Sequence, residues 1–146
     1  MIYSLSFGAN IGNREQTLQQ ALEMIEQQIG HVLRCSSYYY SEPWGFVSTH
    51  PFCNLCCAVE TGMAPLELLS ATQAIEKELG RTHKTVNKQY TDRTIDIDII
   101  LAFDNKHKSM TIDSPTLIIP HPLWEQRDFV KVPLNEILES TITSEK

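Results

Sequence analysis

Apolar residues along the chain alternate with polar ones in some segments and recur every three to four residues in others. Alternation is the pattern of a strand with one buried face, and the longer spacing is that of an amphipathic helix. Glycine, proline and asparagine separate the segments and favour turns. The pattern predicts strands over 2–7, 32–41, 52–61 and 95–103, a short strand over 117–119, and helices over 18–29 and 66–79, each followed by a glycine.

The order of the main segments is strand, helix, strand, strand, helix, strand. This order is the split βαβ pattern of ferredoxin-like folds. We therefore predict an α+β fold, a ferredoxin-like βαββαβ sandwich, formed by a single domain over 1–146 with extra, partly helical elements at its C-terminal end. Both helices are expected on one face of the sheet, which leaves the other face for loops and ligand.

Length, composition and charge narrow the class of protein. The chain has 146 residues, of which 42% are hydrophobic, and no apolar run approaches the roughly 20 residues that cross a bilayer. It begins without a basic leader followed by an apolar stretch, so we expect a cytoplasmic protein. The net charge of −6 argues against nucleic acid, because phosphate backbones attract basic surfaces. We expect small-molecule partners, no membrane partner and a monomer.

The four cysteines lack the spacing of a zinc site. Three of them, Cys53, Cys56 and Cys57, lie in one predicted strand, and no matching histidine or second cysteine pair follows. Cys53 and Cys57 share a strand face with Leu55 and Val59, which predicts a core position. Burial as reduced thiols is favoured over a metal or redox role.

Two aspartates on the strand predicted over 95–103 carry the sharpest chemical signal. Side chains alternate along a strand, so Asp96 and Asp98 point to the face opposite the isoleucines that precede and separate them. They lie about 6.6 Å apart along the strand, so both side chains can lean toward one cation. Carboxylate oxygens without a nearby histidine or cysteine favour magnesium over zinc. A solvated strand face explains the pair equally well by itself.

Cations gather around this strand in the sequence. The segment 81–92 just before it is polar and basic, lacks packing periodicity and is predicted to be a mobile loop. Magnesium carboxylates beside several cations suit a polyphosphate, because the cations neutralise charge that builds up during phosphoryl transfer. Surface solubility explains each cation alone, whereas their clustering indicates phosphate chemistry. The set is Arg81, His83, Lys84, Lys88 and Arg93, with His121 and Arg127 further along the chain.

The strand predicted over 52–61 offers a surface for a flat heterocycle. Phe52 and Asn54 share the face opposite its core side chains. An aromatic ring can stack on a heterocycle, and an amide offers a donor and an acceptor to its edge. Phe129 is a candidate for the other side of the heterocycle. The alternative is that both phenylalanines belong to the core.

Taken together, these segments resemble the 6-hydroxymethyl-7,8-dihydropterin pyrophosphokinases of folate biosynthesis. The matching segments run in the family's order and cover nearly the whole chain. The resemblance implies transfer of pyrophosphate from ATP to the hydroxymethyl group of a reduced pterin, which leaves AMP. The most specific segments are the Arg-Thr-x-Asp-x-Asp strand over 93–98 and the Pro-His-Pro element over 120–122, and the others are 7–13, 40–45, 52–54, 75–81 and 127–130 with 133–134.

The resemblance also implies which residues form the site. Two magnesium ions would be held by Asp96 and Asp98, and Arg81 and Arg93 would act in catalysis by stabilising the attacked β-phosphorus. No general base is assigned, because a metal-bound carboxylate is a poor base. The co-substrate ATP would contact Glu76, Arg81, Arg93, Ile99, His121 and Arg127. The pterin would contact Gly8, Ser41, Glu42, Pro43, Trp44, Phe52, Asn54 and Phe129.

The chain departs from the family pattern at a few positions. His83 stands where family members often carry a second arginine, and this would make a phosphate contact depend on pH. Tyr90 is the aromatic residue available for a later loop position. Asp92 replaces a frequent proline, and Ala9 replaces the usual serine. These changes concern loop contacts to ATP rather than the class of reaction.

Two rival interpretations exist at the level of the residues. A catalytically silent ferredoxin-like module that binds a nucleotide or a partner protein would tolerate the loss of Asp96 or Asp98. Another magnesium phosphotransferase, or a metal-dependent nuclease, would also use the aspartate pair. The acidic net charge argues against the nuclease.

Overall fold

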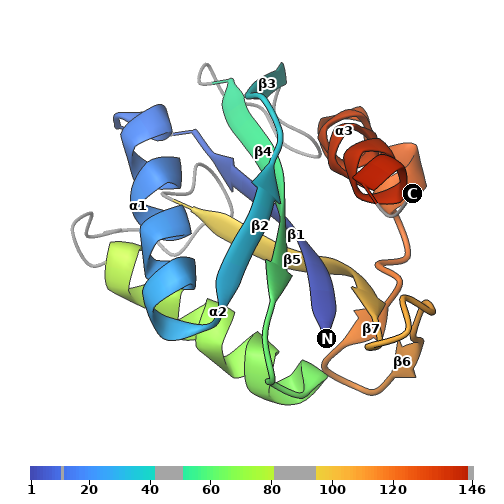
Figure 1. Ribbon diagram of the computed structural model, residues 1–146. Helices are drawn as coiled ribbons and strands as arrows, with labels where there is room; N and C mark the ends of the chain where they lie inside the picture. The colour runs from blue at the N-terminus through green and yellow to red at the C-terminus, as the bar shows by residue number, and fades with distance from the viewer. Residues whose placement is uncertain (11, 42–50, 81–94, 145–146) are drawn as a thin grey trace.

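The structure, a computed structural model, describes residues 1–10, 12–41, 51–80 and 95–144. An antiparallel sheet forms its centre, with helices on both sides (Figure 1). None of the helices in these ranges is long and apolar enough to cross a membrane. The elements are β1 Ile2–Ala9, α1 Arg14–Gln28, β2 His31–Cys35, β3 Tyr39–Ser41, β4 Phe52–Glu60, α2 Pro65–Gly80, β5 Asp96–Phe103, β6 Ile112–Asp113, β7 Ile118–Ile119, the 3-10 helix η1 Trp124–Gln126 and α3 Asp128–Ser144.

The strand order confirms the predicted fold. The large sheet runs β2-β4-β1-β5, and its neighbouring strands are antiparallel. Because β4 lies between β1 and β2, the sheet has the split arrangement that the order of segments predicts. The short strand β3 pairs with the first residues of β4, and β6 and β7 form a separate two-stranded sheet. The α+β, ferredoxin-like prediction is thus confirmed.

The first core lies between the sheet and the helices α1 and α2. Leu18, Ala21 and Ile25 are spaced by four residues or fewer, so they form one buried stripe along α1. The alternate residues of β4 from Cys53 to Val59 belong to the same core. The predicted burial of these thiols is confirmed, and all four cysteines of the chain are free.

A second core covers part of the opposite sheet face, which corrects the expectation that helices lie on one face only. The helix α3 packs against β4 on the side away from α1 and α2 (Figure 1). Its residues Val130, Leu134 and Ile137, again at helical spacing, pack with Cys56 of β4 and Ile100 of β5. The local pattern marks the C-terminal segment as partly helical, but which surface that helix covers depends on tertiary packing.

The strand predicted over 32–41 is in fact two strands, β2 and β3. The ladder is interrupted because the hydroxyl of Ser36 accepts the backbone N–H of Cys56 at 2.9 Å. The backbone N–H of Ser37 donates to the carboxylate of Glu136 in α3 at 3.0 Å. Side-chain partners therefore replace part of the strand pairing between β2 and β3, while the backbone N–H of Ser36 still donates to the carbonyl of Cys56 at 2.8 Å.

A β-bulge in β5 positions the Pro-His-Pro element. Leu5 of β1 pairs with Ile99, whereas Ser4 pairs with Leu101, so Ile100 is an extra residue in β5. The carbonyl of Ile100 accepts the backbone N–H of His121 at 3.0 Å. This bond holds His121 beside the strand that carries the two aspartates.

Candidate active site

Residues from three neighbouring strands form a row at one end of the sheet. Gly8, in the middle strand β1, pairs with Asn54 of β4 on one side and with Asp96 of β5 on the other. Strands lie about 4.8 Å apart, so the backbones of Asn54 and Asp96 are about 10 Å apart. In the next row on the same face, Ser6 pairs with Asp98. The pairing brings the predicted carboxylate pair close to the predicted heterocycle platform.

The space above Gly8 is occupied by two side chains of β4. A Cβ atom at this position would lie 3.0 Å from Oδ1 of Asn54 and 3.4 Å from Cδ1 of Phe52. The first distance is shorter than ordinary van der Waals contact, so a larger residue would displace the amide. Because glycine leaves this space open, Asn54 and Phe52 can lie across the middle strand.

Asn54 is held in place by both hydrogens of its side-chain amide. Nδ2 donates to the carbonyl of Tyr39 at 2.9 Å and to Oγ of Ser41 at 2.8 Å, both in β3. The residue is only 2% exposed, so these bonds are shielded from water. Within the described residues, Oδ1 above Gly8 is the amide atom that can face a ligand. The sequence predicted that this amide offers both a donor and an acceptor to a ligand. In the structure the donor hydrogens are already used, so the amide offers the ligand its acceptor oxygen.

Asp96 and Asp98 are half-buried residues on the same face of β5. Across the described ranges, no group of three or more histidine, cysteine, aspartate or glutamate side chains is arranged to hold a metal ion. A cation at this pair would take its other ligands from outside that set. Magnesium commonly does so, since it keeps several waters and binds substrate phosphates beside one or two carboxylates.

Glu76 of α2 is bonded to the backbone between the two aspartates. Its Oε2 accepts the backbone N–H of Ile97 at 2.7 Å. Because β5 is an edge strand, an N–H on its outer side has no further strand to pair with. The charge-assisted bond from the carboxylate satisfies this N–H and ties α2 to β5.

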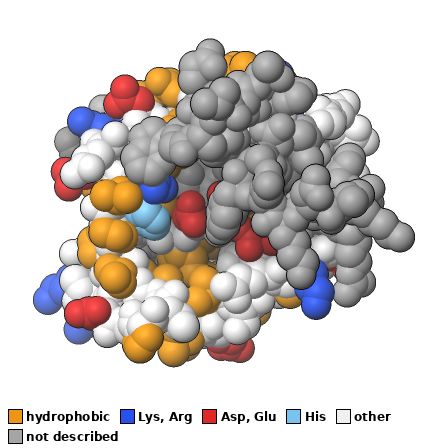
Figure 2. Space-filling model, turned by 180° about the vertical axis from the view of Figure 1, so that it is seen from behind, with side chains coloured by type: hydrophobic (Ala, Val, Ile, Leu, Met, Phe, Trp, Pro, Cys, Tyr) orange, Lys and Arg blue, Asp and Glu red, His pale blue; other side chains and the backbone are white. Residues whose placement is uncertain are grey.

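A cavity of about 280 Å³ lies beside Asp98 and His121. Its largely apolar wall includes Leu69 of α2, Ile97 and Ile99 of β5, Pro122 and residues 115–118. Seen from behind, the molecule shows acidic, histidine and hydrophobic side chains next to one another at its surface (Figure 2). An apolar wall with a few polar groups at one side suits a ring-bearing ligand with an anionic end.

His121 is set up as a neutral hydrogen-bond donor. Its Nδ1 accepts the backbone N–H of Leu123 at 3.2 Å, so in the neutral ring the proton resides on Nε2. Burial lowers the pKa of His121 below its ordinary value of 6.5, and the positive charge of Arg127 lowers that pKa further. Near pH 7 the ring can therefore donate from Nε2 to an anion.

Arg127 and Phe129 meet at the start of α3. The guanidinium carbon of Arg127 lies 5.9 Å from the centre of the Phe129 ring, within the range of a cation–π contact. Phe129 packs partly against the second core and is half-buried, as is Phe52. Each residue is thus partly exposed, so neither is wholly part of a core.

Several of the predicted site residues lie outside the described residues, and their roles stay predictions. They are Arg81, Arg93, Glu42, Pro43 and Trp44, together with His83, Tyr90, Asp92 and the mobile loop predicted over 81–92.

The structure adds residues that the sequence did not indicate. Tyr39 acts on Asn54 through its backbone carbonyl, so no side-chain pattern could mark it. Residues 115–118 line the cavity although they carry no motif. Arg14 donates from Nη1 to the carbonyl of Pro51 at 2.8 Å, a contact between segments that are far apart in the chain. Only the folded chain brings these residues together.

Comparisons of the sequence with known proteins agree on one family. A family model described as 7,8-dihydro-6-hydroxymethylpterin-pyrophosphokinase matches residues 4–139. The 2-amino-4-hydroxy-6-hydroxymethyldihydropteridine pyrophosphokinase of Porphyromonas gingivalis is 46% identical over 137 residues, which cover 93% of this chain and 90% of that protein. The Bacillus subtilis protein of the same name is 38% identical over 136 residues, covering 92% of this chain and 77% of that protein.

Solved structures share the fold. An HPPK-DHPS chain in complex with substrates matches with a TM-score of 0.66 at 17% identity, covering 93% of this chain and 40% of that chain. The HPPK-DHPS triple mutant of Plasmodium falciparum matches with a TM-score of 0.62 at 17% identity, covering 88% of this chain and 38% of that chain. The resemblance noted from the sequence is confirmed by the sequence matches. The chain belongs to the 7,8-dihydro-6-hydroxymethylpterin-pyrophosphokinase family.

Proposed function

We propose that this chain carries out its pyrophosphokinase reaction at the row formed by Asn54, Gly8 and Asp96. The enzyme transfers pyrophosphate from ATP to 6-hydroxymethyl-7,8-dihydropterin in folate biosynthesis. The main observation in favour of this location is that Gly8 pairs with Asn54 of β4 on one side and with Asp96 of β5 on the other. It places the amide platform and the carboxylates about 10 Å apart, so a hydroxymethyl group of one ligand can reach a phosphate of the other.

In this proposal the pterin lies against β4 with its edge at Asn54. The amino and ring N–H groups of a pterin are donors, and Oδ1 of Asn54 is an acceptor above Gly8. Phe52 and Phe129 are both half-buried aromatic residues, and their rings would stack on the flat heterocycle. Ser41 supports the site by accepting a hydrogen bond from Asn54. Backbone contacts from Glu42, Pro43 and Trp44 remain part of the proposal on the strength of the resemblance.

ATP is placed at the cavity beside Asp98 and His121. The apolar wall that includes Ile99 suits the adenine ring, and Nε2–H of His121 suits a phosphate oxygen. Arg127 lies close enough to lower the pKa of His121, so its charge reaches the same region. Glu76 acts on ATP indirectly, through its bond to the backbone of β5. Contacts from Arg81 and Arg93 rest on the resemblance.

We further propose that Asp96 and Asp98 hold two magnesium ions together with the phosphates of ATP. The donor set fits this metal, because both side chains offer hard oxygen atoms and both are half-buried rather than enclosed. Magnesium bound there would supply positive charge that neutralises the phosphate oxygens.

The proposed reaction is an in-line displacement at the β-phosphorus of ATP. The hydroxymethyl oxygen forms a bond to the β-phosphorus, the bond from that phosphorus to the oxygen bridging to the α-phosphate breaks, and AMP leaves. The proton of the hydroxyl group is released, and no side chain is assigned as its acceptor. Asn54 and Phe52 orient the alcohol, while the cations offset the charge on the phosphates.

The reaction is tested by mixing purified protein with ATP, magnesium and 6-hydroxymethyl-7,8-dihydropterin. We expect phosphorus NMR and chromatography to show AMP and the pterin diphosphate in equal amounts. Formation of ADP, or no AMP at all, would contradict the assignment.

The metal role is tested with the variant Asp98→Ala. We expect turnover to fall by roughly 10³-fold or more, because a ligand to the catalytic metal is lost, while pterin binding by calorimetry persists. The matched control is Asp113→Ala, which removes an exposed aspartate of β6. Near-normal turnover of Asp98→Ala is the result expected of a catalytically silent module, and it would refute the metal role.

The oligomeric state and the cellular compartment of the protein are proposed from its exposed hydrophobic residues and its cysteines. Among the residues that the structure describes, the large exposed hydrophobic ones are Leu33, Tyr38, Tyr40, Leu66, Ile118 and Val132, and they are spread over several elements. Such scattered residues favour a monomer of one domain, so light scattering should give a mass near 16.6 kDa. The four free cysteines favour a reducing compartment such as the cytoplasm.

A further inference from the structure

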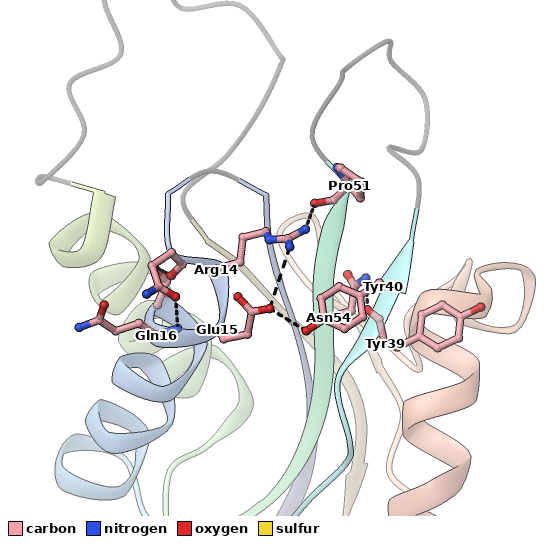
Figure 3. Close-up of polar contacts among 9 residues, drawn as sticks. Arg14, Glu15, Gln16, Tyr39, Tyr40, Pro51 and Asn54 are labelled. Carbon is pink, nitrogen blue, oxygen red and sulfur yellow. Dashed lines mark hydrogen bonds and ion pairs between the residues drawn. The ribbon is translucent and has the colours of Figure 1, made fainter.

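The first two residues of α1 contact the strand ends that carry the pterin platform (Figure 3). Arg14 donates from Nη1 to the carbonyl of Pro51 at 2.8 Å, and its guanidinium carbon lies 5.4 Å from the centre of the Tyr40 ring. The hydroxyl of Tyr40 donates to Oε2 of Glu15 at 2.6 Å. The side chains of Arg14 and Glu15 are 4.0 Å apart at their closest charged atoms.

The contact between Tyr40 and Glu15 is a hydrogen bond to a charged acceptor. It lowers the pKa of the Glu15 carboxyl and raises the pKa of the Tyr40 hydroxyl. Near neutral pH the carboxylate of Glu15 is therefore ionised and the hydroxyl of Tyr40 keeps its proton. A hydrogen bond from a neutral hydroxyl to an ionised carboxylate is stronger than one between two neutral groups.

From Tyr40 the contacts continue to Asn54 through β3. Side chains alternate along a strand, so Tyr40 points to the face of α1 while Tyr39 and Ser41 serve the opposite face. The carbonyl of Tyr39 and the hydroxyl of Ser41 accept the two amide hydrogen bonds of Asn54. Movement of Tyr40 would thus carry both partners of the Asn54 amide with it.

The strand β3 needs such an anchor because it is short. It spans three residues and, in the described part of the chain, pairs with β4 alone, so it has few ladder bonds to fix its register. On the other side of the platform, Pro51 directly precedes Phe52, the first residue of β4. The bond from Arg14 to Pro51 therefore holds the backbone from which the Phe52 ring projects.

We propose that Arg14, Glu15 and Tyr40 are positioning residues for the pterin, acting through β3 and Pro51 on Asn54 and Phe52. This inference rests on the proposed function, because it takes the pterin to bind at Asn54 and Phe52. Tyr40 is 52% exposed, so the three residues form their network at the surface. Surface contacts of this kind contribute little to global stability, but they set the geometry of the residues they hold.

The first test compares Tyr40→Phe with Tyr38→Phe. Tyr38 is the matched control, since its hydroxyl accepts a hydrogen bond from Gln19 of α1 at 2.9 Å and, within the described residues, bonds to neither Asn54 nor Phe52. Its ring lies 6.5 Å from that of Tyr40, and phenylalanine keeps this ring. For Tyr40→Phe we expect the KM for the pterin to rise about fivefold, with the KM for ATP and the melting temperature nearly unchanged. Tyr38→Phe should leave all three values as they are.

The second test asks whether the pterin KM depends on a hydrogen-bond acceptor at position 15. Glu15→Gln keeps an oxygen that can accept from Tyr40, whereas Glu15→Ala does not. We expect Glu15→Ala to reproduce the rise in the pterin KM and Glu15→Gln to restore most of the loss. If Glu15→Ala lowers the melting temperature and raises both KM values together, the residue is merely structural and the proposal is wrong.

A third variant separates this inference from the function on which it rests. Asn54→Ala should weaken pterin binding, measured directly by calorimetry, by more than tenfold, because the buried acceptor for the pterin is lost. Unchanged binding in Asn54→Ala would refute the location of the pterin itself. Suppose instead that Asn54→Ala weakens pterin binding, while Tyr40→Phe and Glu15→Ala keep a normal KM for the pterin. This result would refute the positioning role of Arg14, Glu15 and Tyr40 but leave the location of the pterin intact.

Discussion

Single residues set the dimensions of the proposed pterin site, and Gly8 does so by having no side chain. Its neighbours Asn54 and Phe52 occupy the space that a Cβ atom would need. In the sequence, the glycine predicts a turn after the first strand, and the family resemblance adds a contact with the pterin; the structure instead has Gly8 inside β1. The reason for the glycine appears when β4 is seen beside β1, because the amide and the ring lie over the position.

The substitution Gly8→Ala tests this close approach. The new Cβ would be 3.0 Å from Oδ1 of Asn54, so the amide must shift from the place proposed for the pterin edge. We expect the KM for the pterin to rise about tenfold or more, measured in steady-state assays with ATP saturating. The control Gly62→Ala meets no atom within 4 Å and should behave as the parent protein. Equal effects of the two substitutions would contradict the explanation.

Asn54 illustrates how much of a residue's role can be predicted from the sequence before the fold is known. The amide predicts hydrogen bonding to a heterocycle, and the strand pattern predicts its face. The pattern does not reveal that both amide hydrogens are used by Tyr39 and Ser41. Those partners come from β3, a strand that alternation alone could not separate from β2.

Among the elements, β5 is held at its outer edge by a hydrogen bond from its backbone to the helix α2. The aspartates lie on either side of Ile97, whose N–H is bonded to Glu76 of α2. The resemblance assigns Glu76 to ATP, and the structure shows a contact with the strand that carries the aspartates. We interpret Glu76 as a residue that holds the carboxylate pair in position.

Replacing Glu76 should therefore alter the response to magnesium. We expect Glu76→Ala to raise the magnesium concentration for half-maximal rate about tenfold, because the strand between the aspartates loses a charge-assisted hydrogen bond. Hydrogen exchange followed by NMR should show faster exchange of the Ile97 amide. Glu76→Gln keeps an acceptor and should be less affected, and Glu78→Ala, an exposed glutamate of the same helix, is the control. An unchanged magnesium dependence would argue for direct contact with ATP instead.

At the scale of the whole molecule, the sheet has a core on each face. The core under α1 and α2 follows from the alternation of β1, β4 and β5 and from the helical stripes. The core under α3 was not expected, and it covers a face that the sequence suggested for ligand. The proposed site therefore lies in the rows next to α3 rather than across the whole sheet face.

The contribution of the second core can be measured by unfolding. Leu134 is fully buried in α3, and Leu134→Ala should lower the free energy of unfolding by about 2–5 kcal/mol, because it leaves a cavity. Val132→Ala, in the same helix but 49% exposed, should change that free energy by about 0.5 kcal/mol or less. Urea unfolding followed by circular dichroism measures both. Similar values for the two variants would mean that α3 is not part of the cooperative fold.

The sequence by itself determined the features that depend on short spacings along the chain. Periods of two and of three to four residues predict most strands and helices, and the alternation of β5 places Asp96 and Asp98 on one face. The tertiary structure alone decided which segments meet. The row of Asn54, Gly8 and Asp96, the place of α3 and the bond from Arg14 to Pro51 join residues distant in the chain. Such contacts arise from strand register and helix packing, and no local pattern of side chains encodes either by itself.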